Sequence, residues 1–244
     1  MSDQGTAAPP DFLTGSGGVS PIPAPGSVGS VDHLHLFAAP LLVFDLLGME
    51  ETNRALAASL LTESQTSSGQ ERSNVGGWHS TPDLAHRSQA CYRTLMQAIV
   101  ECTAGSVVRF ASEAGLGEPP PYRYGLNAWA MVMRSGDYSI VHDHGDSHFS
   151  SAYYVDAGDA DTDTHPQSGL LAFVDPRSGG RPIANLDLFP STFTVRPRTG
   201  MLVLFPGWLQ HYVHAYRGTR PRISISCNVF MDPAVRPGGP SIKP

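Results

Sequence analysis

The stretch IVHDHGDSH at positions 140–148 places three histidines and two aspartates directly before an apolar run. His142 and His144 stand two residues apart at the end of an expected strand, so both imidazoles would point to the same face. The best candidate for a third ligand is His211, which follows the strand and Pro-Gly turn in GMLVLFPGWLQ. Two imidazoles and a third group with one open side suit a redox-active iron that also binds a co-substrate and oxygen.

Arg222 lies eleven residues after His211, in the run PRISISCNVF, which is the next expected strand. A guanidinium one strand away from a metal can hold a carboxylate through two parallel hydrogen bonds. The pattern therefore predicts a site for a 2-oxo acid, with the metal at the 2-oxo end and Arg222 at the far carboxylate. A second register stays open, because His144-Gly145-Asp146 is itself a His-x-Asp pair.

The elements that would position these residues are short strands. Between 122 and 230 roughly eight apolar or alternating runs are separated by Gly, Pro and Asp, which is typical of an antiparallel barrel or jelly roll. Upstream, the pattern predicts a buried strand at 33–46, a helix at 50–63 and a longer helix at 81–115 that begins near Thr81. Because the helices precede the strands, we expect an α+β, mainly β, domain with the N-terminal helices outside one sheet.

Composition sets the remaining expectations. Residues 1–30 are rich in Pro, Gly and Ser and are expected to form a flexible arm, 31–234 a single domain, and 235–244 a flexible tail. A net charge of −6 without a basic stripe argues against nucleic-acid binding. The three cysteines lack CxxC spacing and are expected to be buried free thiols. With neither a secretory leader nor a membrane-length apolar run in the sequence, we expect a soluble cytoplasmic protein; a homodimer is one option left open.

At these residues the sequence resembles the Fe(II)/2-oxoglutarate-dependent oxygenases, and within that superfamily a group of bacterial oxygenases. The resemblance runs from about 33 to 230. Its landmarks, in order, are LFAAPLLVFDL, RSNVGGWHS, HDH with SSAYYV after it, LVLFPGWLQHYV and RISISCN. It implies a double-stranded β-helix (a cupin-like jelly roll) and the cofactors Fe(II), 2-oxoglutarate and O2.

The resemblance also implies roles for individual residues. His142 would be the first metal ligand and His211 the last, and Arg222 with Ser224 would bind the tail of 2-oxoglutarate. The wider superfamily has His-x-Asp/Glu at the first pair, whereas the narrower group also carries His-x-His, so His144 is carried over as a ligand. We prefer this register because Gly136 lies six residues before His142, the turn-to-histidine spacing expected from the superfamily.

The function implied is a dioxygenase that hydroxylates a C–H bond of a small molecule (an amino acid, a peptide or a secondary-metabolite intermediate) and releases succinate and CO2. Desaturation or cyclisation, the identity of the substrate and the role of the arm stay open. The alternative is a three-His metal cupin, a thiol-dioxygenase-like enzyme or an isomerase, that does not use 2-oxoglutarate. Five polar or aromatic residues are candidates for binding substrate: Asn74, Trp78, His79, His148 and Asn228. Turn capping or core packing explains four of them equally well, and a position at the rim of the site is the simpler interpretation of His148.

Overall fold

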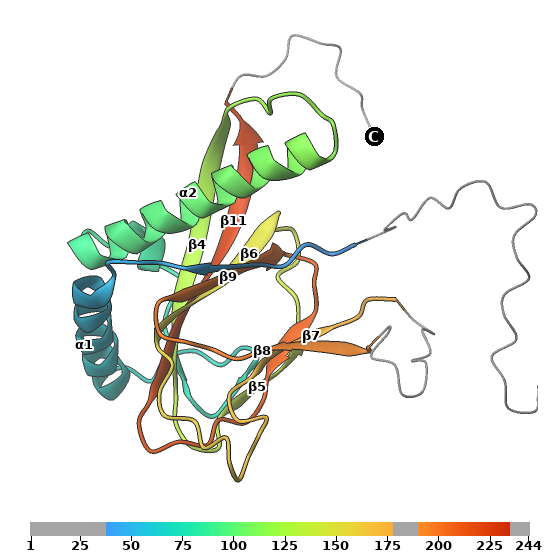
Figure 1. Ribbon diagram of the computed structural model, residues 1–244. Coiled ribbons are helices and arrows are strands. Elements are labelled where there is room, and N and C mark those ends of the chain that lie inside the picture. The colour runs from blue at the N-terminus through green and yellow to red at the C-terminus, as the bar shows by residue number, and fades with distance from the viewer. Residues whose placement is uncertain (1–37, 178–189, 235–244) are drawn as a thin grey trace, which may run out of the picture. The chain divides into compact units, whose positions relative to one another are not determined.

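The computed structural model describes residues 38–177 and 190–234, which form two antiparallel sheets and two helices (Figure 1). The expected arm (1–30) and tail (235–244) lie outside the described residues, as do residues 31–37 of the predicted domain. The elements, in chain order, are β1 (Leu42–Asp45), α1 (Glu50–Thr66), β2 (Asn74–Val75), β3 (Trp78–His79), the 3-10 turn η1 (Leu84–His86), α2 (Ala90–Glu113), β4 (Tyr122–Met133), β5 (Tyr138–His142), β6 (Phe149–Asp156), β7 (Leu171–Val174), β8 (Thr192–Val195), β9 (Met201–Pro206), β10 (His211–Val213) and β11 (Arg222–Pro233).

The larger sheet has the strand order β1-β9-β6-β11-β4-β3, and β11 at its centre pairs with β4 along its whole length. Side chains alternate between the two faces of a strand. On β11 the apolar residues Ile223 and Ile225 belong to the core under the helices. The residues that alternate with them, Arg222, Ser224 and Ser226, line a cavity on the opposite face. One strand thus supplies both a structural face and a polar, site-facing one.

Helices α1 and α2 cover the outer face of this sheet (Figure 1). Their fully buried side chains include Leu56 and Leu60 of α1 and Tyr92 and Ile99 of α2, which share one hydrophobic core with the sheet. The Tyr153 hydroxyl of β6 also donates a 2.7 Å hydrogen bond to the side-chain Oδ1 of Asn53 in α1. These contacts confirm that the N-terminal helices pack outside one sheet. None of the described helices is long and apolar enough to cross a membrane.

The smaller sheet has the order β2-β5-β10-β7-β8. A second hydrophobic core fills the space between the sheets, with Tyr154, Val203 and Phe205 from the larger sheet and Leu171 and Phe173 from the smaller. Two antiparallel sheets packed in this way form a jelly roll. The predicted fold class, α+β but mainly β, is confirmed, and the eight strands expected between 122 and 230 are β4 to β11.

The N-terminal elements differ from the predicted ones in their bounds. The helix expected at 81–115 is split: a 3-10 turn is followed by α2, which starts at Ala90 rather than near Thr81. The Thr81 hydroxyl donates to the Asp83 carboxylate instead of capping a helix, and Arg87 also binds that carboxylate. These side-chain bonds hold the segment before α2 in a turn. Gly115, with φ +66°, follows the helix end as expected.

Other boundaries shifted less. Helix α1 extends three residues past the expected 63, to Thr66, and only Leu42–Asp45 of the expected strand 33–46 pairs as a strand. Strands β2 and β3 were not predicted, because each is two residues long and flanks the Gly76-Gly77 turn. Of the three free cysteines, Cys227 is buried as expected, whereas the two in α2 are only half-buried.

Candidate metal centre

Three histidines from two strands and one loop converge inside the barrel. His142 ends β5 and His211 begins β10, and the two are paired directly across the sheet. His144 follows two residues after His142, where its N–H donates to the Gly207 carbonyl. One ring nitrogen of each histidine lies within 4.8 Å of the other two, and the Nε2 atoms of His144 and His211 are 3.2 Å apart. The structure therefore brings together all three predicted ligands.

Backbone carbonyls orient two of these rings. The Nδ1 of His142 lies 2.8 Å from the Ile140 carbonyl, and the Nδ1 of His211 lies 2.9 Å from the Leu209 carbonyl. A carbonyl only accepts, so each Nδ1 carries the proton and each Nε2 keeps its lone pair for the cluster. Metal-binding histidines are commonly fixed in this way by a partner at the second nitrogen.

Burial keeps the three imidazoles uncharged. Burial lowers the pKa of His144 to about 3, together with the neighbouring His211 and His142 rings, because adjacent imidazolium charges would repel. Burial, with the nearby His142 ring, lowers the pKa of His211 to about 4. The pKa of His142 is also lowered, chiefly by burial. At neutral pH the cluster thus offers three neutral nitrogen donors, which suit a divalent transition metal.

Asp146, the ligand in the alternative register, is exposed and stands outside the cluster. Within 38–177 and 190–234, the three histidines are the one group of potential ligands close enough to share an ion. The geometry thus favours His142-x-His144 over His144-x-Asp146.

A cavity beside the histidines contains a buried cation without a counterion. Arg222 is 2% exposed, its Nε has no hydrogen-bond partner, and its Nη1 reaches only the Met133 sulfur and the Ser224 hydroxyl, both at 3.4 Å. Burial lowers the pKa of Arg222. The guanidinium carbon lies 4.9 Å from the centre of the Tyr154 ring. None of the residues lining this cavity is acidic: Ser73, Trp129, Met131, Met133, Ser139, His142, Ala152, Tyr154, Leu171, Phe205, His211, Val213, Arg222, Ser224 and Ser226.

Among the residues of this cavity that the sequence did not single out, two have polar groups next to predicted site residues. Tyr154 is fully buried and its hydroxyl has no partner, so a polar group beside Arg222 is left unsatisfied. Alternation along SSAYYV could have placed one tyrosine inward, but not which one. Ser73 lies just before β2, and its hydroxyl is 3.3 Å from the Nε2 of His142. No pattern in RSNVGGW singles it out.

The candidate substrate residues do not line the cavity. Asn74 caps the Gly76-Gly77 turn: its amide nitrogen donates to both glycine carbonyls, and its oxygen accepts from the Arg72 N–H. Trp78 is part of the core under the helices. Both positions match the structural alternatives that the sequence offered for them.

The other three lie nearer the site or at its rim. His79 is buried and stacks on Trp129 with ring centres 5.8 Å apart, and Trp129 in turn lies 5.4 Å from His144. His148 is exposed, and its Nδ1 accepts from the Met231 N–H. The side-chain oxygen of Asn228 accepts a hydrogen bond from the Ser150 hydroxyl. Asn228 lies on β11 two residues beyond Ser226, the last residue of this strand that lines the cavity. Contact of any of the five with a substrate stays a prediction.

Comparisons with known proteins agree with this geometry. Residues 127–228, which include the three histidines and Arg222, match the model of a family described as "Putative 2OG-Fe(II) oxygenase". No curated protein matches the sequence of the chain.

Among solved structures, the non-heme alpha-ketoglutarate-dependent carbocyclase SnoK from nogalamycin biosynthesis is 15% identical, with a TM-score of 0.53 over 80% of this chain and 80% of that chain. HygX from Streptomyces hygroscopicus, solved with nickel and 2-oxoglutarate, is 13% identical, with a TM-score of 0.51 over 79% of this chain and 83% of that one. A prolyl hydroxylase from Trichoplax adhaerens, in complex with a peptide fragment, is 15% identical, with a TM-score of 0.50 over 78% and 83%.

These structural likenesses show a shared fold, the jelly roll. The predicted resemblance is confirmed by the family match together with the three-histidine cluster. Residues 127–228 are therefore similar to a 2OG-Fe(II) oxygenase, a family whose description names iron and 2-oxoglutarate.

Proposed function

We propose that this protein is an Fe(II)- and 2-oxoglutarate-dependent dioxygenase that hydroxylates a C–H bond of a small molecule, with release of succinate and CO2. The observation that carries the proposal is the unpaired Arg222 guanidinium, which lines the same cavity as the neutral His142 and His211 rings. A buried guanidinium without a carboxylate partner is costly, so the cavity is suited to an anionic ligand. 2-Oxoglutarate carries a metal-chelating end and a distal carboxylate, the two features that these groups complement.

Each residue of the cavity has a specific role in this proposal. His142, His144 and His211 hold iron through Nε2. When bound, Fe(II) supplies the redox chemistry that couples oxidation of 2-oxoglutarate by O2 to oxidation of the substrate. Arg222 and Ser224 bind the distal carboxylate of 2-oxoglutarate, and the hydroxyl of Tyr154 donates to the same group. This arrangement gives every unpaired polar atom in the cavity a partner.

The walls of the cavity favour oxidation of a C–H bond. Large apolar or aromatic side chains, among them Trp129, Met131, Leu171 and Phe205, exclude water from around the histidines. The fold is shared with a prolyl hydroxylase that was solved with a peptide fragment and with a carbocyclase from nogalamycin biosynthesis. We infer that the substrate is an amino acid, a peptide or a secondary-metabolite intermediate, and that a cytoplasmic setting suits it.

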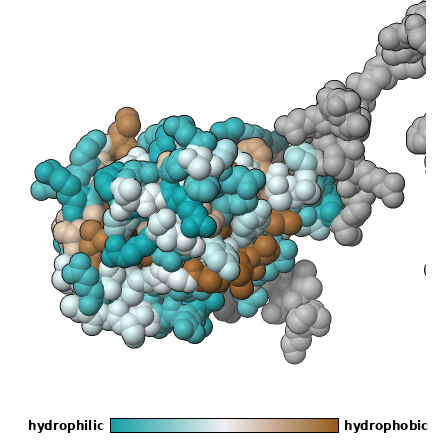
Figure 2. Space-filling model, turned by 90° about the horizontal axis from the view of Figure 1, so that it is seen from below, coloured by the Kyte–Doolittle hydropathy of each residue, from teal (hydrophilic) through white to brown (hydrophobic). Residues whose placement is uncertain are grey.

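The described surface is compatible with such a partner. Figure 2 shows a face that is largely hydrophilic, with hydrophobic residues in small separate groups. The net charge of −6 continues to argue against nucleic acid as a substrate. A homodimer stays a prediction, which light scattering on the purified full chain would test.

The proposal is tested by anaerobic titration of the full chain with Fe(II) and 2-oxoglutarate. We expect a weak visible charge-transfer band that saturates with 2-oxoglutarate, and succinate release when air is admitted. Arg222→Ala should raise the 2-oxoglutarate requirement at least tenfold, as expected for loss of a charge-assisted pair. Arg220→Ala is the matched control, because Arg220 lies two residues away, is exposed and binds Asp156.

Other outcomes of this titration distinguish a 2-oxoglutarate-dependent dioxygenase from the alternative, a three-His metal cupin. If iron binds to the histidines but no 2-oxoglutarate-dependent band or succinate appears, the metal-cupin alternative is favoured. If the band appears with equal affinity in the Arg222→Ala protein, the assignment of the distal carboxylate is wrong.

A further inference from the structure

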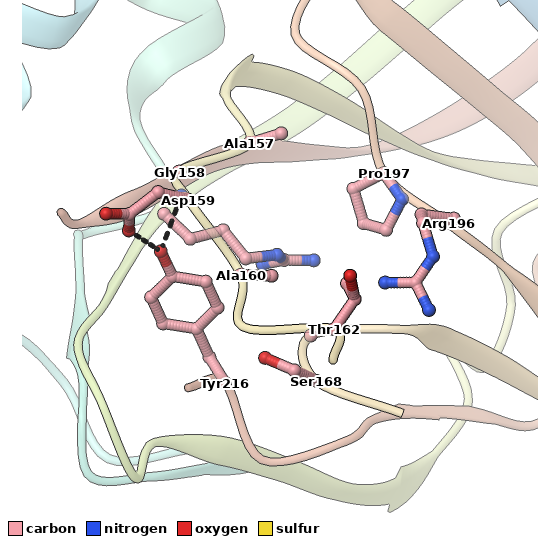
Figure 3. A pocket seen from close by; sticks show the side chains of 11 residues that line it. Ala157, Gly158, Asp159, Ala160, Thr162, Ser168, Arg196, Pro197 and Tyr216 are labelled. Atoms are coloured by element: carbon pink, nitrogen blue, oxygen red, sulfur yellow. Dashed lines mark hydrogen bonds between the residues drawn. The ribbon is translucent and has the colours of Figure 1, made fainter. Parts of the chain in front are cut away.

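A second cavity meets the proposed co-substrate cavity at Arg222. It has a volume of about 280 Å³ and is lined by residues 157–160 and Thr162 after β6, Ser168 and Gly169 before β7, Arg196 and Pro197 after β8, and Tyr216 (Figure 3). Arg222 lines both cavities and is the one residue common to their linings. Its side chain therefore separates the two spaces.

This cavity is cationic. Figure 3 shows the Arg196 guanidinium extending into it, on the same side as Thr162, whereas the Ser168 hydroxyl points away from Arg196 and is hydrogen-bonded to the Arg217 backbone. Arg196 has a hydrogen bond to the Pro166 carbonyl, but no salt bridge with an acidic group joins it among the described residues. Gly169 lies beside the buried part of Arg222, since a Cβ at Gly169 would stand 3.8 Å from the unpaired Nε.

The single acid of the lining cannot neutralise these arginines. Asp159 Oδ1 accepts from the Tyr216 hydroxyl at 3.0 Å and from the backbone N–H groups of Thr219 and Arg220 at 2.9 and 2.8 Å. The hydrogen bond from the Thr219 hydroxyl to Oδ2, together with these bonds, holds the pKa of Asp159 far below its usual range. Figure 3 places its carboxylate at the Tyr216 edge of the cavity, away from Arg196. Two arginines and the Thr162 hydroxyl thus line a space in which no carboxylate is free to neutralise them.

We propose that this second cavity binds a small oxyanion, a carboxylate or phosphate group, between Arg196 and Arg222, and that the bound anion weakens the binding of 2-oxoglutarate. The two anions antagonise each other because the positive charge of Arg222 stabilises both, and each anion that is bound neutralises part of that charge. By thermodynamic linkage, bound 2-oxoglutarate lowers the affinity for the anion by the same factor. The antagonism rests on the proposed function, whereas anion binding itself does not.

The first experiment measures anion binding without iron or 2-oxoglutarate. Succinate and inorganic phosphate are titrated separately into the metal-free full chain by isothermal calorimetry, and the tighter of the two identifies the class of oxyanion. Arg196→Ala should weaken binding about tenfold, the loss expected for one charge-assisted hydrogen bond. Arg198→Ala is the matched control: it removes the same charge two residues away, where the side chain pairs with Asp45 outside the cavity. Equal affinity in the two variants, or no saturable binding of either anion, would overturn the proposal.

The second experiment measures the antagonism. With Fe(II) bound under anaerobic conditions, the apparent Kd of 2-oxoglutarate should rise about fivefold or more in saturating phosphate, within the usual range of coupling between sites. At the phosphate concentration that just saturates the wild type, the rise should be clearly smaller in Arg196→Ala, whose affinity for phosphate is about tenfold lower. A rise of equal size in that variant at the same concentration would mean that phosphate binds at the histidines, which contradicts the proposal. If 2-oxoglutarate does not bind at all, the proposed function fails, while the calorimetry still decides whether the anion site exists.

Discussion

Replacing Arg222 by methionine should make the protein more stable without 2-oxoglutarate and less stable with it. The guanidinium is 2% exposed, and its Nε lacks a partner, so the folded apoprotein bears the cost of a buried, unpaired charge. This cost is several kcal/mol in other proteins. The guanidinium carbon lies 4.9 Å from the centre of the Tyr154 ring, and this cation–π contact offsets about 2 kcal/mol of that cost. Methionine keeps most of the side-chain volume and has no charge to bury.

We therefore expect the free energy of unfolding of the Arg222→Met apoprotein to rise by about 1–2 kcal/mol. For a domain of this size the melting temperature would rise by roughly 2–8 °C. In the wild type, a co-substrate at 100 times its Kd adds about 2.7 kcal/mol to the stability of the folded state. The variant should lose this addition, so the order of the two melting temperatures reverses as 2-oxoglutarate is added.

The assay is thermal unfolding followed by circular dichroism, in anaerobic Fe(II) buffer, across a 2-oxoglutarate series. Arg220→Met serves as the control, since Arg220 is exposed and its pair with Asp156 is worth little. It should melt like the wild type at every concentration. The reasoning is refuted if Arg222→Met melts below the wild type without 2-oxoglutarate and still gains the wild-type increment with it.

Three further outcomes follow from the geometry. His144→Ala should lower iron affinity at least tenfold, whereas Asp146→Asn should leave it unchanged; inverse effects in a metal titration would restore the alternative register. Tyr154→Phe removes a hydroxyl without a partner, so apoprotein stability should not fall, while the Kd of 2-oxoglutarate should rise about tenfold by titration. Unfolded imidazoles take up protons near pH 6.5, but folded His211 does so only near 4; apoprotein stability should therefore fall from pH 7 to pH 5 in urea titrations, and a flat profile would contradict its burial.

The three-histidine cluster could be predicted from the sequence because local rules place its members. His142 and His144 obey the two-residue period of a strand end, and His211 follows a Pro-Gly turn that starts a new strand. The alternation along β11 similarly puts Arg222, Ser224 and Ser226 on one face. The mainly β fold followed from strand count and turn residues. In each case the signal lies within a few residues of the position that it describes.

The remaining features of the site depend on pairing between distant segments. Whether Tyr153 or Tyr154 faces the cavity depends on the register of β6 against β11, which shifts between Ile223 and Ser224. A similar shift between β5 and β10 lets Ser139 and His142 line one cavity although they are three residues apart. Such shifts have no marker in the local sequence. Even a correct strand assignment therefore leaves the inward residues ambiguous.

The charge balance of the barrel gives an independent reason to expect a dianionic co-substrate. Three neutral imidazoles leave the two charges of Fe(II) uncompensated, and Arg222 adds a third positive charge to a cavity whose lining has no acid. A centre with one carboxylate ligand would have one positive charge fewer. 2-Oxoglutarate, with two negative charges, brings the total of three down to one and places each carboxylate against a cation. A neutral co-substrate, or none, would leave the full charge buried, which is why this ligand set favours a 2-oxo diacid over the substrates of a metal cupin.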